Sequence, residues 1–299
     1  MALAAFVANA VLAGGNAVGI RFSNRELAPL WGAGLRFSLA AALLSGAMVI
    51  LRLAPPRGRA LTGALLYGLF NFGGSFGLAY YGLVRVQAGL GQTVLALVPL
   101  ATLLLAVAQR QEHLRPRAIL GTVLALAGIA VMSRGPLQES VPLLSLLAVI
   151  GSALCFAEAA VLVRRYPRVH PVTMNAIGMT AGAAFLLAWS VLKREPHPLP
   201  ERAATWFALS YLVIVGSVLV FVLYLIVLRR WTASRAAYVF VLIPLVTVFL
   251  SAWLDDEPIG TGLLVGGIVV LAGVYIGALR PAKQFTTATD RTRSAHRTP

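Results

Sequence analysis

Two segments of this chain share one pattern: Gly121-Thr122-Val123-Leu124-Ala125-Leu126-Ala127-Gly128 and Gly266-Gly267-Ile268-Val269-Val270-Leu271-Ala272-Gly273. They lie 145 residues apart, and the same offset relates Pro99 to Pro244 and Glu112 to Glu257. The second half of the chain is therefore interpreted as a copy of the first. Duplicated membrane units tend to place a transport site where their two halves meet.

The composition is that of an integral membrane protein. Of 299 residues, 59% are hydrophobic and only 12% are charged, and the mean hydropathy is +0.84. A helix needs about 20 apolar residues to cross a bilayer, and the apolar runs here are continuous and do not alternate as in a membrane barrel. We predict an all-α protein with ten transmembrane helices. Their expected ranges are 3–22, 30–51, 60–82, 87–108, 117–133, 142–163, 171–192, 203–228, 232–254 and 259–279.

Ten spans make five per half. Because five is odd, the second copy must enter the membrane from the opposite side, so the repeat is predicted to be inverted around a central cavity. We divide the chain into a first five-helix repeat, a second inverted repeat and a basic, disordered cytoplasmic tail. Their ranges are 1–137, 138–280 and 281–299. Basic residues split roughly 16 to 7 between the two sides, which predicts cytoplasmic N- and C-termini in an inner (plasma) membrane.

The formal charge of +15 comes from short connections and the tail. It indicates orientation in the bilayer and excludes nucleic acid as the expected partner. Cys155 is the single cysteine, so no thiolate cluster is expected, and the four histidines fall in connections or the tail. With no GxxxxGK[ST] loop either, we expect no metal, no cofactor and no enzymatic activity in what we take to be a monomer.

The repeated Pro, Glu, Gly, Gly pattern, together with Arg36-Phe37 early in the second span, resembles the EamA-type members of the drug/metabolite transporter superfamily. The resemblance covers nearly the whole chain up to about residue 280. The nearest subgroup by overall likeness is the YddG-type aromatic amino-acid exporters. The resemblance implies ten spans and a substrate site between spans one, three and four of one half and six, eight and nine of the other.

Polar residues inside spans are costly and are therefore candidate site residues. Phe72 and Phe76 join them because two aromatic rings one turn apart could line an apolar pocket. The candidates for substrate binding are Asn16, Asn71, Phe72, Ser75, Phe76, Gln92, Thr93, Glu158, Ser217 and Tyr238. For each amide or hydroxyl, a hydrogen bond between helices is the alternative.

Glu158 is the only acidic residue that we place inside a span. It could bind a substrate ammonium group or exchange a proton, or it could pair with Arg164 or Arg165 near the membrane surface. Arg36 and Arg235 lie only a few residues inside their spans and are expected to extend to the interface in structural roles.

Pro99 and Pro244 lie near the middle of the fourth and ninth predicted spans, where each could kink its helix and shape a gate of the cavity. A kink fixed by packing is the alternative for both.

We therefore expect a secondary transporter that exports small amphipathic metabolites, among them amino acids including aromatic ones, by alternating access. Two alternatives stay open: an exporter of hydrophobic cations or drugs, and a membrane scaffold or receptor without transport activity. The expected partners are the small-molecule substrate and the lipid bilayer.

Overall fold

The computed structural model describes residues 2–83, 95, 97–132, 143–243, 245–246 and 261–279. All regular secondary structure in these ranges is helical. Within them, four helices are long and apolar enough to cross a membrane: Pro29–Ile50, Leu143–Arg165, Pro171–Leu192 and Ala203–Arg230. Several shorter apolar helices accompany them. The predicted all-helical membrane class is confirmed.

The α-helices are α1 (Ala2–Gly14), α2 (Asn16–Ser23), α3 (Pro29–Ile50), α4 (Arg59–Gly68), α5 (Phe76–Leu83), α7 (Val98–Ala108), α8 (Pro116–Met132), α9 (Leu143–Arg165), α10 (Pro171–Leu192), α11 (Ala203–Val213), α12 (Val220–Arg230), α13 (Ala233–Ala236) and α15 (Thr261–Val274). Three π-helical segments continue them: η1 (Leu69–Ser75), η2 (Ile214–Leu219) and η3 (Tyr275–Leu279). Helices α3 and α10 both begin on a proline, which suits the first turn because its amide would have no partner there.

The first predicted span, 3–22, is not one continuous helix. It breaks at Gly15, between α1 and α2. A Cβ atom at Gly15 would lie 2.3 Å from the Tyr211 hydroxyl, and that hydroxyl donates a hydrogen bond to the Leu12 carbonyl at 2.7 Å. A donor from another helix thus binds a carbonyl one turn before the break, a recognised way to interrupt a helix.

The third and eighth predicted spans each change to π-helical winding in their middle. Leu69 begins η1 and Ile214 begins η2, so the two segments start 145 residues apart. Each is flanked on both sides by α-helix, α4 and α5 in one case and α11 and α12 in the other. π-helical turns of this kind occur often at functional sites.

Pro99 lies in the first turn of α7, which begins at Val98 after a turn at Leu97. A proline is well suited to this position, because the first turn of a helix needs no backbone donor from it. The predicted role of Pro99 in shaping a gate stays a prediction. In the ninth predicted span, α13 ends at Ala236, a turn follows, and residues 239–243 are helical again.

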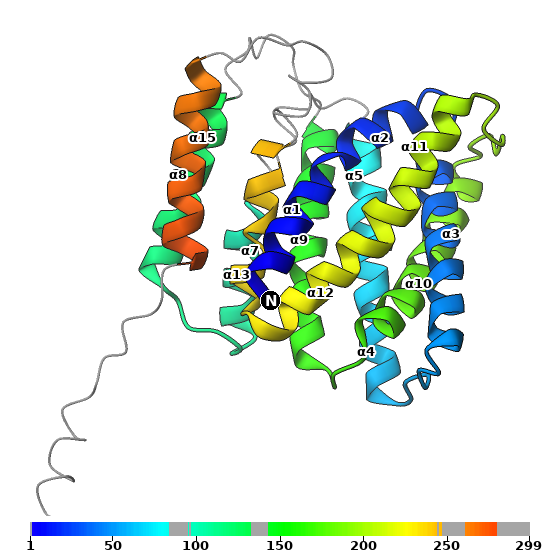
Figure 1. Cartoon of the computed structure of the whole chain (residues 1–299), viewed down its shortest axis with the longest axis horizontal. Helices are drawn as coiled ribbons and strands as arrows, with labels where there is room; N and C mark the ends of the chain where they lie inside the picture. The colour runs from blue at the N-terminus through cyan, green and yellow to red at the C-terminus, as the bar shows by residue number, and fades with distance from the viewer. Residues whose placement is uncertain are drawn as a thin grey trace, which may run out of the picture.

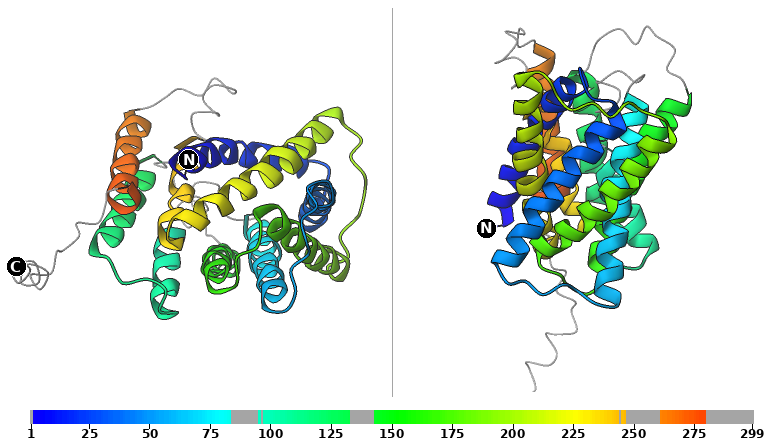
Figure 2. Two further views of the ribbon diagram at one scale, coloured as in Figure 1. Left: turned by 60° about the horizontal axis from the view of Figure 1, so that its bottom comes forward. Right: turned by 90° about the vertical axis from the view of Figure 1, so that its right-hand side faces the viewer.

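The helices stand side by side, as Figure 1 shows, with α8 and α15 together at one edge and α3 and α10 together at the other. Between them, α1 and α2 run along α12 and α11, a neighbourhood that both views of Figure 2 retain. The glycine-rich helices α8 and α15 touch closely: a Cβ atom at Gly121 would lie 2.7 Å from the Gly273 carbonyl, and one at Gly128 would lie 2.7 Å from the Gly266 carbonyl. These pairings run in opposite directions along the chain, so α8 and α15 are antiparallel.

The connections that follow α3, α7, α9 and α12 all lie at one end of the bundle (Figure 1). Arginines gather in them, among them Arg52, Arg57, Arg110, Arg115 and Arg168. The connection between α10 and α11 lies at the opposite end.

Candidate functional site

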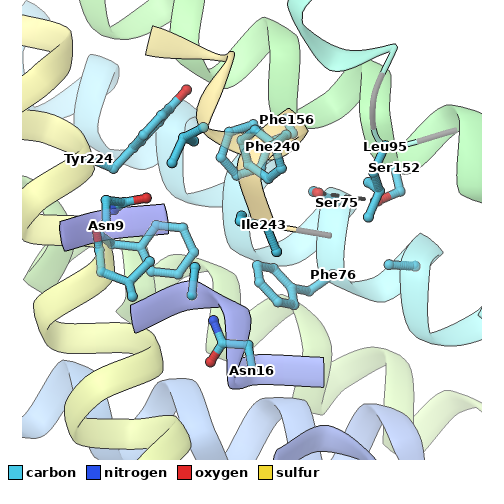
Figure 3. A pocket seen from close by; sticks show the side chains of 15 residues that line it. Asn9, Asn16, Ser75, Phe76, Leu95, Ser152, Phe156, Tyr224, Phe240 and Ile243 are labelled. Atoms are coloured by element: carbon cyan, nitrogen blue, oxygen red, sulfur yellow. Dashed lines mark hydrogen bonds between the residues drawn. The ribbon is translucent and has the colours of Figure 1, made fainter. Parts of the chain in front are cut away.

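A cavity opens at the centre of the bundle, where α1, α2, α5, α9 and α12 approach one another. Figure 3 shows its principal side chains. The lining residues among those described are Asn9, Ala13, Asn16, Ser75, Phe76, Ala79, Leu95, Ser152, Phe156, Val220, Phe221, Tyr224, Val239, Phe240 and Ile243. Most of them are apolar, and the few polar groups come from different helices, which is the usual composition of a small-molecule site.

Aromatic rings form two groups in the cavity wall. Phe156 packs edge-on against Phe240, with ring centroids 4.3 Å apart, and Tyr224 lies 5.4 Å from Phe156. Phe76 and Phe221 form the second group, with centroids 6.1 Å apart. In Figure 3 the Phe156–Phe240 pair and Phe76 lie on different sides of the cavity. The site therefore offers apolar surface on both sides of a bound molecule.

Four polar side chains, each from a different helical segment, interrupt this apolar lining. Asn9 donates a hydrogen bond to the Val220 carbonyl across the α1–α12 contact. Ser75 and Ser152 share a hydrogen bond of 3.3 Å. The buried Tyr224 hydroxyl has no partner among the described residues, so it is available to a ligand.

Helical spacing explains which residues line the cavity. Asn9 and Ala13 are four residues apart on α1, and Ser152 and Phe156 are four apart on α9. Such spacing places side chains on one helix face. The lining residues that were not predicted as site residues include Asn9, Phe156, Tyr224 and Phe240. Asn9 could have been found as a polar residue inside an apolar span. The other three of these are distinguished in the sequence only by being aromatic.

Arg36 lies directly behind the cavity wall and is the unexpected residue of the site. Its Nε donates to Ser217 Oγ at 2.8 Å and its Nη2 donates to the Gly216 carbonyl at 2.9 Å. Nη2 also lies 3.4 Å from Asn16 Oδ1. The guanidinium carbon is 5.4 Å from the Phe76 ring centroid, within cation–π range. Arg36 thus joins the break in the first span to the π-helical segment of the eighth.

The expectation that Arg36 extends to the membrane interface is wrong, because its side chain is only 1% exposed. It turns into the bundle, where η2 supplies acceptors: a serine hydroxyl and a carbonyl at a glycine. A Cβ atom on Gly216 would lie 1.9 Å from Asn16 Oδ1, so glycine at this position lets Asn16 and Arg36 take the positions they have. A charged arginine at the centre of a membrane helix costs roughly 2.5–3.5 kcal/mol by insertion measurements, which marks such residues as functional.

The structure brings some predicted site residues together and separates others. Asn16, Ser75 and Phe76 line the cavity, and Ser217 reaches it through Arg36 and Asn16. Phe72 lies one layer behind, fully buried, with its ring centroid 5.0 Å from Phe37.

Asn71 also lies behind the wall. Its Nδ2 is 3.4 Å from the Tyr67 hydroxyl, which in turn donates to Asn175 Oδ1 at 3.2 Å. Asn71 Oδ1 and Asn175 Nδ2 have no hydrogen-bond partner among the described residues. This small polar group connects η1 to α10 and does not reach the cavity lining.

Tyr238 and Glu158 lie outside the lining as well. The Tyr238 hydroxyl donates to the Ala118 carbonyl at 2.7 Å and contacts Thr122 Oγ1 at 3.1 Å, so it ties the ninth predicted span to α8. Both Glu158 carboxylate oxygens accept from Gln109 Nε2, at 2.9 and 2.8 Å. Arg164, a suggested partner of Glu158, instead donates to the Leu228 and Trp231 carbonyls.

Three predicted residues, Gln92, Thr93 and Pro244, lie outside the described residues. Within the described part of the chain, no group of three His, Cys, Asp or Glu side chains is placed to hold a metal ion.

Known proteins resemble this chain along most of its length. An uncharacterized transporter of Bacillus subtilis, YyaM, is 26% identical over 271 residues, covering 86% of this chain and 88% of the relative. The uncharacterized inner membrane transporter YedA of Escherichia coli is 29% identical over 266 residues, covering 86% and 84%. A probable amino-acid metabolite efflux pump of Salmonella typhimurium is 26% identical over 279 residues, covering 89% and 91%.

A solved crystal structure matches the fold with a TM-score of 0.78 at 19% identity, covering 93% of this chain and 96% of the other. The model of the EamA-like transporter family matches residues 1–134 and 143–278. The apolar helices, the central cavity and this match agree: the chain is a membrane transporter protein that belongs to the EamA-like transporter family.

Proposed function

We propose that this protein is a secondary transporter that exports small amphipathic metabolites, amino acids including aromatic ones, across an inner membrane by alternating access. The central cavity is the substrate site. Its apolar walls, formed by Phe76, Phe156 and Phe240, suit an aromatic or aliphatic side chain, while Asn16 and the Tyr224 hydroxyl offer hydrogen bonds to polar groups. The name of the Salmonella relative, a probable amino-acid metabolite efflux pump, points in the same direction.

The observation that carries this proposal is where the cavity lies. Segments from the first half (α1, α2 and α5) and from the second half (α9 and α12) line it together. Transporters built from repeats place their sites at such a junction. Rocking of the halves would expose the cavity to either side in turn.

An inverted five-plus-five repeat is part of the proposal. The family model matches two stretches of nearly equal length, 1–134 and 143–278. The 145-residue offset also exchanges the two glycine contacts between α8 and α15: Gly121 with Gly273 becomes Gly266 with Gly128. A twofold relation between antiparallel copies accounts for that exchange, and it supports alternating access through paired motions of the halves.

The orientation that we propose puts the arginine-rich connections, and both termini, in the cytoplasm. These connections share one end of the bundle (Figure 1), and the positive-inside rule assigns such an end to the cytoplasm. YedA, a relative, is named an inner membrane transporter.

Counterflow into proteoliposomes tests the function. Purified protein would be reconstituted in vesicles loaded with unlabelled L-phenylalanine, L-leucine or L-threonine, and entry of the labelled amino acid would be followed. Saturable uptake above protein-free vesicles is the expected result. The absence of saturable uptake for a broad panel of amino acids would overturn the proposal.

A pair of variants on α9 tests the cavity itself. Ser152 lines the cavity, whereas Leu154 points away from the bundle and is 47% exposed. Ser152→Phe should fill the cavity and abolish most uptake, while Leu154→Phe should retain it. Equal activity in the two variants, at equal amounts of folded protein, would show that substrate does not pass through this cavity.

A further inference from the structure

We propose that Arg36 is the anion-recognition residue of this transporter and that its substrates carry a carboxylate, which the Arg36 guanidinium binds. This inference rests on the proposed transport function and narrows the substrate class within it. Four observations support it: an uncompensated positive charge, a free donor, a loosely held neighbour at the cavity wall, and the aromatic rings beside it.

The charge of Arg36 has no counter-ion within the described part of the chain. Its hydrogen-bond partners are a serine hydroxyl, a backbone carbonyl and an asparagine amide. The Tyr80 hydroxyl makes a further hydrogen-bonding contact with the guanidinium, and the Tyr211 hydroxyl lies near it. No carboxylate in the described part of the chain lies within ion-pair distance of Arg36. Buried charges are normally paired, so an anion is the missing partner.

The guanidinium also has an unused donor. Nη1 is buried and has no hydrogen-bond partner among the described residues. Nε and Nη2 are fixed by Ser217 and the Gly216 carbonyl, so the group is held in one orientation with Nη1 left over. An oriented guanidinium with a free N–H is prepared for a carboxylate, which binds arginine through charge-assisted and often bidentate hydrogen bonds.

Asn16 provides the connection between Arg36 and the cavity. It lines the cavity, and the two contacts that hold its side chain among the described residues are long, 3.4 Å to Arg36 Nη2 and 3.5 Å to the Gly216 carbonyl. Contacts of this length are weak. A carboxylate entering the cavity can therefore replace the Asn16 side chain on Nη2 at little cost while it accepts a second hydrogen bond from Nη1.

Phe76 lies on the same boundary, lining the cavity and facing the guanidinium at 5.4 Å. The Phe37 ring centroid lies 5.1 Å from the guanidinium carbon and 4.8 Å from the Phe76 ring centroid. These rings stabilise the charged form when the site is empty, and they exclude water from the ion pair when it is filled. The same positive charge disfavours the alternative of a hydrophobic-cation exporter, because a cation in the cavity would meet Arg36 without a screening anion.

The test compares ligands that differ only at the carboxylate. L-phenylalanine, L-phenylalaninamide and phenethylamine would be added to the purified wild-type protein, and binding would be read from the shift in its thermal unfolding temperature. The same three compounds would then compete for counterflow of labelled L-phenylalanine. We expect L-phenylalanine to bind and compete at least about tenfold better than the other two, the loss typical of removing a charged hydrogen-bond partner.

Variants at Arg36 connect this preference to one residue. Arg36→Gln should remove the preference for the carboxylate, and Arg36→Lys should retain part of it, because an ammonium keeps the charge but not the bidentate geometry. Leu39→Gln, at a position of α3 that is 40% exposed, is the matched control and should keep the full preference. Size-exclusion profiles would verify folding, and the wild-type comparison stands even if Arg36→Gln does not fold.

Each outcome has a definite meaning. Equal binding of the three ligands by the wild type, or an unchanged preference in folded Arg36→Gln, would overturn the role of Arg36 while saturable flux kept the transport proposal intact. Carboxylate-selective binding that depends on Arg36, with no flux of any amino acid, would keep this inference and overturn the transport proposal. Neither binding nor flux would overturn both.

Discussion

The two π-helical segments occupy corresponding places, 145 residues apart, yet their surroundings differ. In η1, the buried Asn71 and Phe72 belong to a packed layer against α10. In η2, the corresponding residues are Gly216 and Ser217, and they receive a buried arginine from α3. The same π-helical winding therefore supports tight packing at η1 and a polar site at η2.

The partner helices make the difference. A 142-residue offset aligns the opening prolines of α3 and α10, Pro29 and Pro171, and it pairs Arg36 with Gly178. Gly178 lets the backbones of α4 and α10 touch: a Cβ atom on Gly68 would lie 2.1 Å from the Gly178 carbonyl. Both contacts join the first half of the chain to the second, but one sets glycine against glycine and the other places a charged side chain among acceptors. Departures from symmetry of this kind are where we locate the specificity of the transporter.

The largest expected effect on stability is at the packed site. Gly68→Ala would push a Cβ atom against backbone atoms that have no alternative rotamer, so we expect a loss of about 1–3 kcal/mol or more, as for other overpacked sites. Thermal unfolding in detergent measures it. Gly46→Ala is the matched control, since nothing lies within 4 Å of that added Cβ. If both variants unfold at the same temperature, the backbone contact is not important for stability.

At the polar site, the corresponding change should affect transport more than stability. The Cβ atom of Gly216→Ala would meet side chains, Asn16 Oδ1 at 1.9 Å and Arg36 Nη2 at 3.1 Å, and side chains can move. We expect an unfolding temperature near that of the wild type and a half-saturation concentration for L-phenylalanine raised about tenfold, through the displaced guanidinium. Unchanged counterflow kinetics would show that the site around Gly216 and Arg36 takes no part in substrate binding.

A smaller contrast is expected from single hydrogen bonds. Ser217→Ala removes the acceptor of Arg36 Nε. We expect the half-saturation concentration for L-phenylalanine to rise about threefold, because side-chain hydrogen bonds between membrane helices are of modest strength. Asn71→Ala, at the corresponding segment, removes only a long contact to Tyr67 and should change half-saturation less than twofold. Counterflow assays at several substrate concentrations distinguish the two, and a larger effect for Asn71→Ala would reverse the comparison.

The smallest effect is expected at Glu158. Its carboxylate accepts two contacts from Gln109 and is absent from the cavity lining. We expect Glu158→Gln to alter the rate and half-saturation of counterflow by less than about twofold, because an amide oxygen can still accept from Gln109. Loss of transport or an altered pH dependence would give Glu158 the substrate or proton role considered from the sequence.

Sequence patterns pointed to part of the cavity lining. Asn16, Ser75 and Phe76 stood out as polar or aromatic residues in apolar spans, and all three line the cavity. Arg36 did not stand out, because its short distance from the start of α3 suggested an interfacial side chain. That distance gives depth along the helix, but it does not give the face on which the side chain lies.

The sequence by itself determined the class of protein: an all-helical membrane protein with long apolar helices. It could do so because a membrane helix satisfies its own backbone hydrogen bonds, so a long apolar run is enough to indicate a spanning helix. Only the tertiary structure decided that Arg36 meets Gly216 and Ser217, 180 and 181 residues away. Apolar contact distinguishes helix faces poorly within lipid; close packing at small residues and a few buried polar groups decide which faces meet, and those are properties of the assembled bundle.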